Sequence, residues 1–221
     1  TQSSPLAVKL QSRTPVENGQ FELVSQTQEW QPQQTALIIC DMWDKHWCPT
    51  SNERVAELAP FMNDVVNNAR ARGIFIIHAP SDVTDFYKDH PGRKLAMEAP
   101  KSNRLPGEIR DWCSWLDEDE QKVYPIDQSD GGCECTDCDS YQAWSRQVAS
   151  IKIQEQDAIS DSGEEIWNML EARGIKNVML IGVHTNMCVL GRPFGLRNMA
   201  RYGKNVVLIR DLTDTMYNPK S

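Results

Sequence analysis

The sequence has few basic residues for the number of its acidic ones. It contains 23 Lys and Arg against 31 Asp and Glu among 221 residues, a formal net charge of −8 at pH 7. Nucleic acids and anionic membrane surfaces are bound through clusters of positive charge. The charge balance therefore argues against a nucleic-acid partner and against a membrane partner.

Long apolar segments are also absent. No run approaches the roughly 20 apolar residues that a membrane-spanning helix requires, and no secretory leader is visible. The sequence begins Thr1-Gln2-Ser3-Ser4 without an initiator Met, which indicates that a preceding piece was removed. The location stays open. The missing Met and the seven cysteines favour a periplasmic or secreted protein slightly over a cytoplasmic one.

Length and composition fit one α/β domain preceded by a short arm. Apolar residues make up 40% and charged residues 24% of the chain, which is ordinary for a globular protein with a sizeable core. Two alternating runs, 6–10 and 21–24, flank the turn signal Asn18-Gly19 and predict a β-hairpin over residues 1–33. The domain is expected over 34–221, with an irregular insertion at about 79–147 that has no clean period.

Strand and helix patterns alternate in the rest of the chain. Apolar runs predict strands at 35–40, 74–78, 148–153, 177–182 and 205–209. Spacing and end signals predict helices at 51–73, 162–174 and 188–202. This order predicts a parallel sheet covered by helices on both faces.

The most informative segment is Gly182-Val183-His184-Thr185-Asn186-Met187-Cys188-Val189, which follows the apolar run 178–181. It predicts a strand, a tight turn and a cysteine at the start of a helix. Helix N-terminal N–H groups stabilise a thiolate and can bind an oxyanion. These features indicate a thiol nucleophile. The alternative is that Cys188 is a small buried apolar residue.

Two aspartates also follow predicted strands, and ligand sites in open α/β sheets lie beyond the carboxyl ends of the strands. Asp41 follows the first strand and Asp211 the last. A thiol nucleophile needs a base, and Asp41 is the candidate to take the Cys188 proton and return it to the leaving group. The backbone N–H groups of His184 and Cys188 would hold the oxyanion. Capping of a turn is the alternative for both aspartates.

The strand that ends in Asp41, together with the segment 182–189, closely resembles the isochorismatase-like cysteine hydrolases. This family includes nicotinamidases, carbamoylsarcosine-type amidases and ureidoacrylate-type amidohydrolases. The resemblance covers roughly residues 34–215. It implies a three-layer α/β/α, Rossmann-like fold and an Asp-Lys-Cys triad that cleaves small amides or ureas through a thioester. It also implies a cis peptide bond before His184, a homo-oligomer and no cofactor.

The lysine of the implied triad is not clearly matched. In the family, the lysine precedes a Ser/Asp-Ala-Phe element by several residues. The matching piece here is Asp157-Ala158-Ile159, and counting back from it without a gap places Ile153 at the lysine position. Because one residue changes the face of a strand, Lys152 is the candidate only if a bulge or a gap shifts it. The alternative for Lys152 is a solvent-facing side chain.

Other residues are candidates for substrate contact. Trp43 and Trp47 would form an aromatic wall, or would pack in the core. His78 is expected to be structural or to contact the substrate, and Asn186 is a further candidate contact. Nicotinamidases carry a metal site made of an Asp-x-His pair and a further His. That full set is not identified in this sequence, so no metal is expected.

Three arginines and three cysteines leave further alternatives open. Arg192, Arg197 and Arg210 would anchor the loop 213–215 or a substrate carboxylate, or would pair at the surface. Cys133, Cys135 and Cys138 would form disulfides, a partial zinc site, or a surface loop with unpaired thiols.

The sequence thus predicts a cysteine-dependent hydrolase that cleaves a C–N bond of a small amide or ureide, with Cys188, Asp41 and Lys152 as its catalytic residues. The expected partner is a small-molecule substrate. One alternative is a catalytically silent binding or structural protein of the same fold. The other is vinyl-ether hydrolysis, as in isochorismatases, which lack the cysteine.

Overall fold

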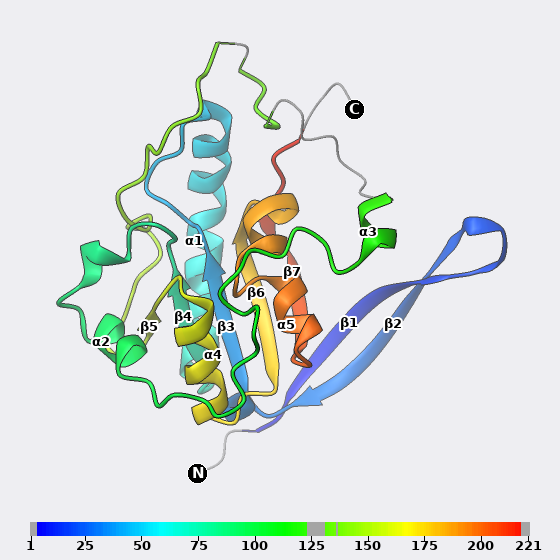
Figure 1. The fold of residues 1–221 in the computed structure, drawn as a ribbon, viewed down its shortest axis with the longest axis horizontal. Helices are drawn as coiled ribbons and strands as arrows, with labels where there is room; N and C mark the ends of the chain where they lie inside the picture. Colours follow the sequence, from blue (N-terminus) through cyan, green and yellow to red (C-terminus); the bar gives the residue numbers. More distant parts are fainter. Residues whose placement is uncertain (1–3, 123–130, 136, 218–221) are drawn as a thin grey trace.

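The computed structural model describes residues 4–122, 131–135 and 137–217, and it contains two sheets (Figure 1). The strands are β1 (Leu6–Pro15), β2 (Phe21–Trp30), β3 (Thr35–Cys40), β4 (Phe75–Ala79), β5 (Ala158–Ile159), β6 (Asn177–Val183) and β7 (Asn205–Asp214). The helices are α1 (Pro49–Ala71), α2 (Pro91–Met97), α3 (Glu118–Lys122), α4 (Gly163–Ala172) and α5 (Leu196–Arg201). Shorter turns are η1 (Glu17–Gly19), η2 (Pro32–Gln34), η3 (Thr84–Tyr87) and the π-helical turn η4 (Thr185–Val189).

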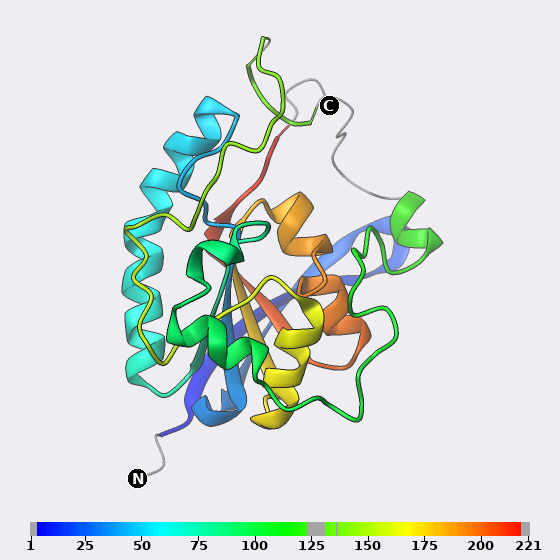
Figure 2. The same ribbon diagram turned by 60° about the vertical axis from the view of Figure 1, so that its left-hand side comes forward.

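The central sheet is parallel, and its five strands run in the order β5-β4-β3-β6-β7. Alternate residues of β3 enter two separate cores, since side chains of a strand alternate between faces. Ala36 and Ile38 pack with α4 and α5, whereas Leu37 and Ile39 pack with α1. Figure 2 shows α1 on one side of the sheet and α4 and α5 on the other. The predicted three-layer α/β/α fold is confirmed.

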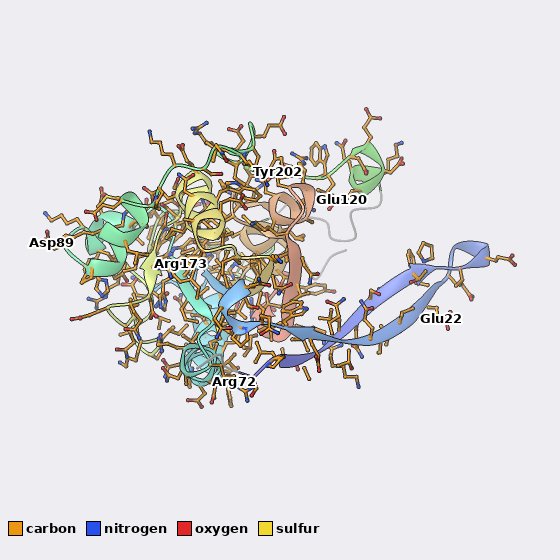
Figure 3. The ribbon with its side chains drawn as sticks, turned by 90° about the horizontal axis from the view of Figure 1, so that it is seen from below. Glu22, Arg72, Asp89, Glu120, Arg173 and Tyr202 are labelled. Atoms are coloured by element: carbon orange, nitrogen blue, oxygen red, sulfur yellow. A yellow bond between two sulfur atoms is a disulfide. The ribbon has the colours of Figure 1, made fainter. Side chains whose placement is uncertain are left out.

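The predicted hairpin arm is also confirmed. Strands β1 and β2 pair antiparallel from Leu6 with Trp30 to Pro15 with Phe21. The base of the arm is anchored, because Leu6 and Trp30 are buried in the core that contains α1. The outer part projects away from the domain, as the position of Glu22 in Figure 3 shows. A boundary between arm and domain at residue 33 stays a prediction.

Two predicted elements are wrong. Residues 148–153 form no strand; the Val148 N–H donates to the Met42 carbonyl, and the strand beyond β4 is β5. Residues 188–202 are not one helix, because η4 and α5 are separated by Arg192-Pro193-Phe194-Gly195. Pro193 has no N–H to continue a helix, so the chain turns before α5 begins at Leu196.

The insertion at 79–147 contains η3, α2 and α3 in its described residues, and its residues 123–130 and 136 lie outside them. None of the helices among the described residues is long and apolar enough to cross a membrane.

Gly182 allows β3 and β6 to approach closely beside the site. It has a φ of +117°, and a Cβ placed there would lie 1.9 Å from the Cys40 carbonyl oxygen. We expect Gly182→Ala to lower the free energy of unfolding by about 3 kcal/mol or more, since strand backbones cannot yield easily. Denaturant unfolding measures this loss.

Gly174→Ala is the matched control. Gly174 also has a positive φ, of +63°, but a Cβ placed there would meet no atom of the described residues within 4 Å. This substitution therefore carries only the backbone cost of about 1 kcal/mol. Equal losses for the two variants would contradict the close approach at Gly182.

Candidate active site

The parallel register brings the functional side chains to one edge of the sheet. Cys40 at the end of β3 lies opposite Ala79 of β4 and Gly182 of β6. The residues that follow these strands, Asp41, Ser81 and the segment 184–188, therefore meet at the carboxyl edge, toward which the strand arrows point in Figure 1. The sequence predicted that Asp41 and Cys188 meet here, but it did not predict Ser81. Asp211, predicted to follow the last strand, lies within β7 and is exposed.

Asp41 is fully buried and has a φ of 49°, a left-handed conformation that Asp adopts more readily than most residues. One carboxylate oxygen, Oδ1, accepts a hydrogen bond of 2.8 Å from the Ser81 N–H. The other, Oδ2, accepts one of 3.2 Å from Nε of Arg192. The buried charge is thus paired with a cation and hydrogen-bonded, as a buried carboxylate requires.

Cys188 lies in η4 and is half-buried. Its thiol interacts with the side chains of both Asp41 and Arg192. The Arg192 N–H also donates to the Cys188 carbonyl at 3.0 Å, which places the two residues one turn apart. A thiol, a carboxylate and a guanidinium therefore interact with one another at this edge of the sheet. The structure brings Cys188 and Asp41 together as expected.

The electrostatics of this group favour a neutral thiol at rest. Burial raises the pKa of Asp41, and the charge of Arg192 opposes that rise. Burial and then the Asp41 charge raise the pKa of Cys188, so that Asp41 holds the negative charge of the pair. The expectation of a thiolate stabilised by a helix N-terminus is therefore wrong. Cys188 lies inside a π-helical turn next to a carboxylate, not at the start of a long helix.

The cation of the site is Arg192, and Lys152 does not reach it. Lys152 is exposed, and its Nζ donates a hydrogen bond of 2.8 Å to the Ala149 carbonyl. Arg192 bridges Asp41 and Asp82, each at 3.2 Å. Lys152 is therefore a solvent-facing side chain, which was the alternative to a catalytic role. Its segment is not a strand of the sheet.

The position of Arg192 carries a signal that the sequence-based prediction missed. Arg192 comes four residues after Cys188, and residues four apart share one face of a helical turn. The predicted roles of Arg192 were contact with the loop 213–215, contact with a substrate, or pairing at the surface. Surface pairing describes Arg210, which pairs with the exposed Asp211. Arg197 is buried instead, and it pairs with Glu120.

An aromatic cluster lies next to the His184 turn. Trp43 stacks on Trp144 with ring centroids 4.1 Å apart. The His46 ring stacks on Trp144 at 5.9 Å and meets the His184 ring edge-on at 5.2 Å. Trp47 contacts His46 at 5.2 Å. Trp43 is buried, in keeping with core packing, whereas Trp47 is half-buried.

Both histidines of this cluster are neutral near pH 7. Burial and the nearby Arg54 lower the pKa of His46 to about 4. Burial, His46 and Arg54 lower the pKa of His184 to about 3. Nε2 of His184 and Nε1 of Trp144 are buried and have no hydrogen-bond partner within the described part of the chain. The peptide bond between Val183 and His184 is cis, as the resemblance implied.

The two remaining candidates for substrate contact have structural partners. The fully buried His78 contacts Oε1 of Gln147 at 2.9 Å and Oδ2 of Asp157 at 3.1 Å. Asn186 uses its amide to bind the backbone of Met216, which lies just beyond β7: Nδ2 donates to the Met216 carbonyl at 2.8 Å, and Oδ1 accepts from the Met216 N–H at 3.1 Å. His78 therefore has a structural role, as one of its two predicted roles stated. Asn186 holds the chain after β7 against η4.

The cysteine cluster contains one disulfide, between Cys135 and Cys138. Cys133 keeps a free thiol in this structure. Among the described residues, no group of three or more His, Cys, Asp or Glu side chains could hold a metal ion.

Comparisons with known proteins give distant similarities only. No family model matches the sequence, and no curated protein matches it. A cysteine hydrolase from Pseudomonas syringae pv. phaseolicola 1448A is 19% identical, with a TM-score of 0.48 over 86% of this chain and 76% of that one. An isochorismatase family protein from Desulfovibrio vulgaris subsp. vulgaris str. Hildenborough is 18% identical, with a TM-score of 0.48 over 85% and 84%.

A third solved structure, an isochorismatase family protein from Burkholderia thailandensis, is 16% identical, with a TM-score of 0.47 over 83% of this chain and 80% of that one. At these identities and scores, the similarities assign no role to any residue of this chain.

Asp157 provides a test of the ion pairs behind the site. Burial opposes its ionisation, but hydrogen bonds from His78, Arg70 and the Gln154 N–H lower the pKa of Asp157 to about 2. Because its folded pKa lies below the ordinary value of 3.8, the ionised carboxylate stabilises the fold above about pH 4, and this contribution is lost as the pH falls toward 2.

We expect Asp157→Asn to be less stable than the unmodified protein by about 2 kcal/mol at pH 7, with the difference shrinking between about pH 4 and pH 2. Urea unfolding of both proteins across this range measures the difference. A difference that stays constant with pH would show that Asp157 acts through packing alone.

Proposed function

We propose that this chain is an isochorismatase-like cysteine hydrolase that cleaves a C–N bond of a small amide or ureide. One observation carries the proposal: the Cys188 thiol, the Asp41 carboxylate and the Arg192 guanidinium interact with one another at the carboxyl edge of the sheet. A nucleophile beside a base, with that base oriented by a third group, is the arrangement that covalent catalysis requires.

In the first half of the reaction, Asp41 acts as the base. Sγ of Cys188 attacks the substrate carbonyl carbon, its proton passes to the Asp41 carboxylate, and the carbonyl electron pair moves to the oxygen. Collapse of this oxyanion breaks the C–N bond, and Asp41 returns the proton to the leaving nitrogen. The products of this half are ammonia or an amine and a thioester on Cys188. The raised pKa of Asp41 suits a base that must accept a proton from a thiol.

In the second half, Asp41 removes a proton from water, which attacks the thioester carbon. Collapse expels the Cys188 sulfur, which takes the proton back from Asp41 and restores the starting thiol. The backbone N–H groups of His184 and Cys188 are proposed to hold the oxyanion in both halves. Arg192 is proposed to orient Asp41 and to keep it ionised until the thiol proton is transferred.

The proposal also includes a small-molecule substrate and a homo-oligomer. The substrate is a small molecule, since the reactive groups are buried or half-buried, and no cofactor takes part in the steps above. The half-buried Trp47 is the proposed aromatic contact. A homo-oligomer is proposed as well, supported by apolar side chains on the outer arm, of which Phe21 is 63% and Leu23 61% exposed.

Substitution of the two reacting groups tests the mechanism. Turnover is measured as ammonia release across a panel of small amides and ureides. Cys188→Ala removes the nucleophile, and we expect a loss of roughly 10³-fold or more in kcat/KM. Asp41→Asn removes the base, with an expected loss of roughly 10²–10⁴-fold.

Cys113→Ser is the control, because the Cys113 thiol is buried elsewhere and donates to the Trp115 carbonyl. It should keep its activity. Full activity of Cys188→Ala would contradict the mechanism in which the Cys188 thiol is the nucleophile. A folded protein with no turnover on the whole panel would favour the catalytically silent alternative.

Arg192 can be tested through the pH profile. Removing its charge raises the pKa of Asp41 further, so the acid limb of kcat/KM should move to higher pH in Arg192→Gln. We expect a loss of roughly 10²-fold for Arg192→Gln at neutral pH and a smaller loss for Arg192→Lys, which keeps the charge. Arg210→Gln, at a site 78% exposed, is the control and should be unchanged. An unmoved acid limb in Arg192→Gln would remove Arg192 from the mechanism.

A further inference from the structure

Two cysteines outside the catalytic group lie in unusually close contact. Sγ of Cys48 and Sγ of Cys133 are 2.6 Å apart, although the residues are separated by 85 positions in the chain. Both are free thiols in this structure. Cys48 is fully buried, while Cys133 is half-buried and so accessible to a reagent from solution.

The surroundings of Cys48 favour its ionised form. Cys48 is the N-cap residue of α1, a helix of 23 residues. Its sulfur lies 3.3 Å from the Thr50 hydroxyl and accepts hydrogen bonds from Ser51. Burial raises the pKa of Cys48, but the bonds from Cys133, Thr50 and Ser51 outweigh it, so the pKa is lowered. A thiolate at such a position is a nucleophile toward disulfides.

The loop that carries Cys133 is already packed in place. Gly132 fits tightly on Met216, since a Cβ at Gly132 would lie 2.9 Å from the Met216 carbonyl carbon and oxygen. The Cys135 N–H contacts Sγ of Cys133 at 3.4 Å, and Cys135 is tied to Cys138. The loop and the start of α1 lie at the same end of the molecule in Figures 1 and 2. Little movement is needed to join Cys48 to Cys133.

We propose that Cys48 and Cys133 are a redox-active dithiol, which a small-molecule disulfide such as oxidised glutathione converts into a second disulfide of this protein. This inference does not depend on the hydrolase activity. It goes beyond the Cys135–Cys138 bond, because it assigns a reversible modification to a different pair of sulfurs. The new bond would tie the N-terminus of α1 to the loop that rests on Met216.

The exchange takes two steps. The accessible Cys133 thiol, on losing its proton, attacks one sulfur of oxidised glutathione and expels the first glutathione thiolate, which takes up that proton. The Cys48 thiolate then attacks Sγ of Cys133 in the mixed disulfide and expels the second glutathione, which takes up the proton lost by Cys48. The two cysteines are oxidised by two electrons, and one oxidised glutathione is reduced to two thiols.

Peptide mapping tests the pairing directly. The purified full chain is equilibrated with oxidised glutathione, its remaining thiols are alkylated in acid-quenched, unfolded samples, and it is digested with trypsin and a Glu-specific protease. Cleavage after Glu134 separates Cys133 from Cys135. We expect a linked product of residues 46–53 and 123–134, with the second bond retained inside 135–146. Alkylated thiols should fall from five to three.

Variants make the result specific. Cys133→Ser and Cys48→Ser should each lack the linked product, whereas the control Cys113→Ser should form it as the unmodified chain does. Addition of excess reduced glutathione should restore the two thiols. Cys48 and Cys133 both alkylated after oxidation, Cys48 linked to a different cysteine, or stoichiometric zinc that protects these thiols would each overturn the proposal.

Discussion

The site depends on how the charge of one buried carboxylate is compensated. Asp41 is fully removed from water, and a buried carboxylate without partners would take up a proton rather than stay ionised. The Ser81 N–H and the Arg192 guanidinium, which contact opposite oxygens, oppose this effect of burial. The same guanidinium interacts with the Cys188 thiol and lowers its pKa. Removing Arg192 would therefore raise the pKa of both Asp41 and Cys188.

This compensation is possible because the backbone delivers the three groups from separate segments. Asp41 comes from the end of β3, Ser81 from beyond β4, and Cys188 with Arg192 from the turn after β6. Parallel strands in register set their ends at one edge, and Gly182 lets β6 approach the Cys40 carbonyl closely enough for η4 to reach Asp41. Asn186 then binds η4 to Met216, and Met216 also packs against Gly132 in the loop of Cys133.

Sequence patterns identified what depends on local periodicity and strand order. The apolar runs of β3, β4, β6 and β7 and the meeting of Asp41 with Cys188 followed from them. The cation of the site, Arg192, did not follow from them. The family resemblance implied a lysine on a strand, whereas the cation is an arginine one helical turn after the nucleophile. The contact between Cys48 and Cys133 joins a helix start to an irregular insertion. No periodicity links two such segments, so only the fold reveals it.

The neutral Cys188 determines the kind of chemistry that this arrangement can support. A thiolate formed in advance would need a positive environment, but burial and the Asp41 carboxylate raise the pKa of Cys188 by more than the Arg192 guanidinium lowers it. The negative charge therefore stays on Asp41 until a substrate carbonyl is attacked, and proton transfer accompanies formation of the S–C bond. Arg192 suits this sequence of steps because it pairs with Asp41, the base that must first be ionised and then protonated. A cation that contacted only the sulfur would not stabilise the ionised base.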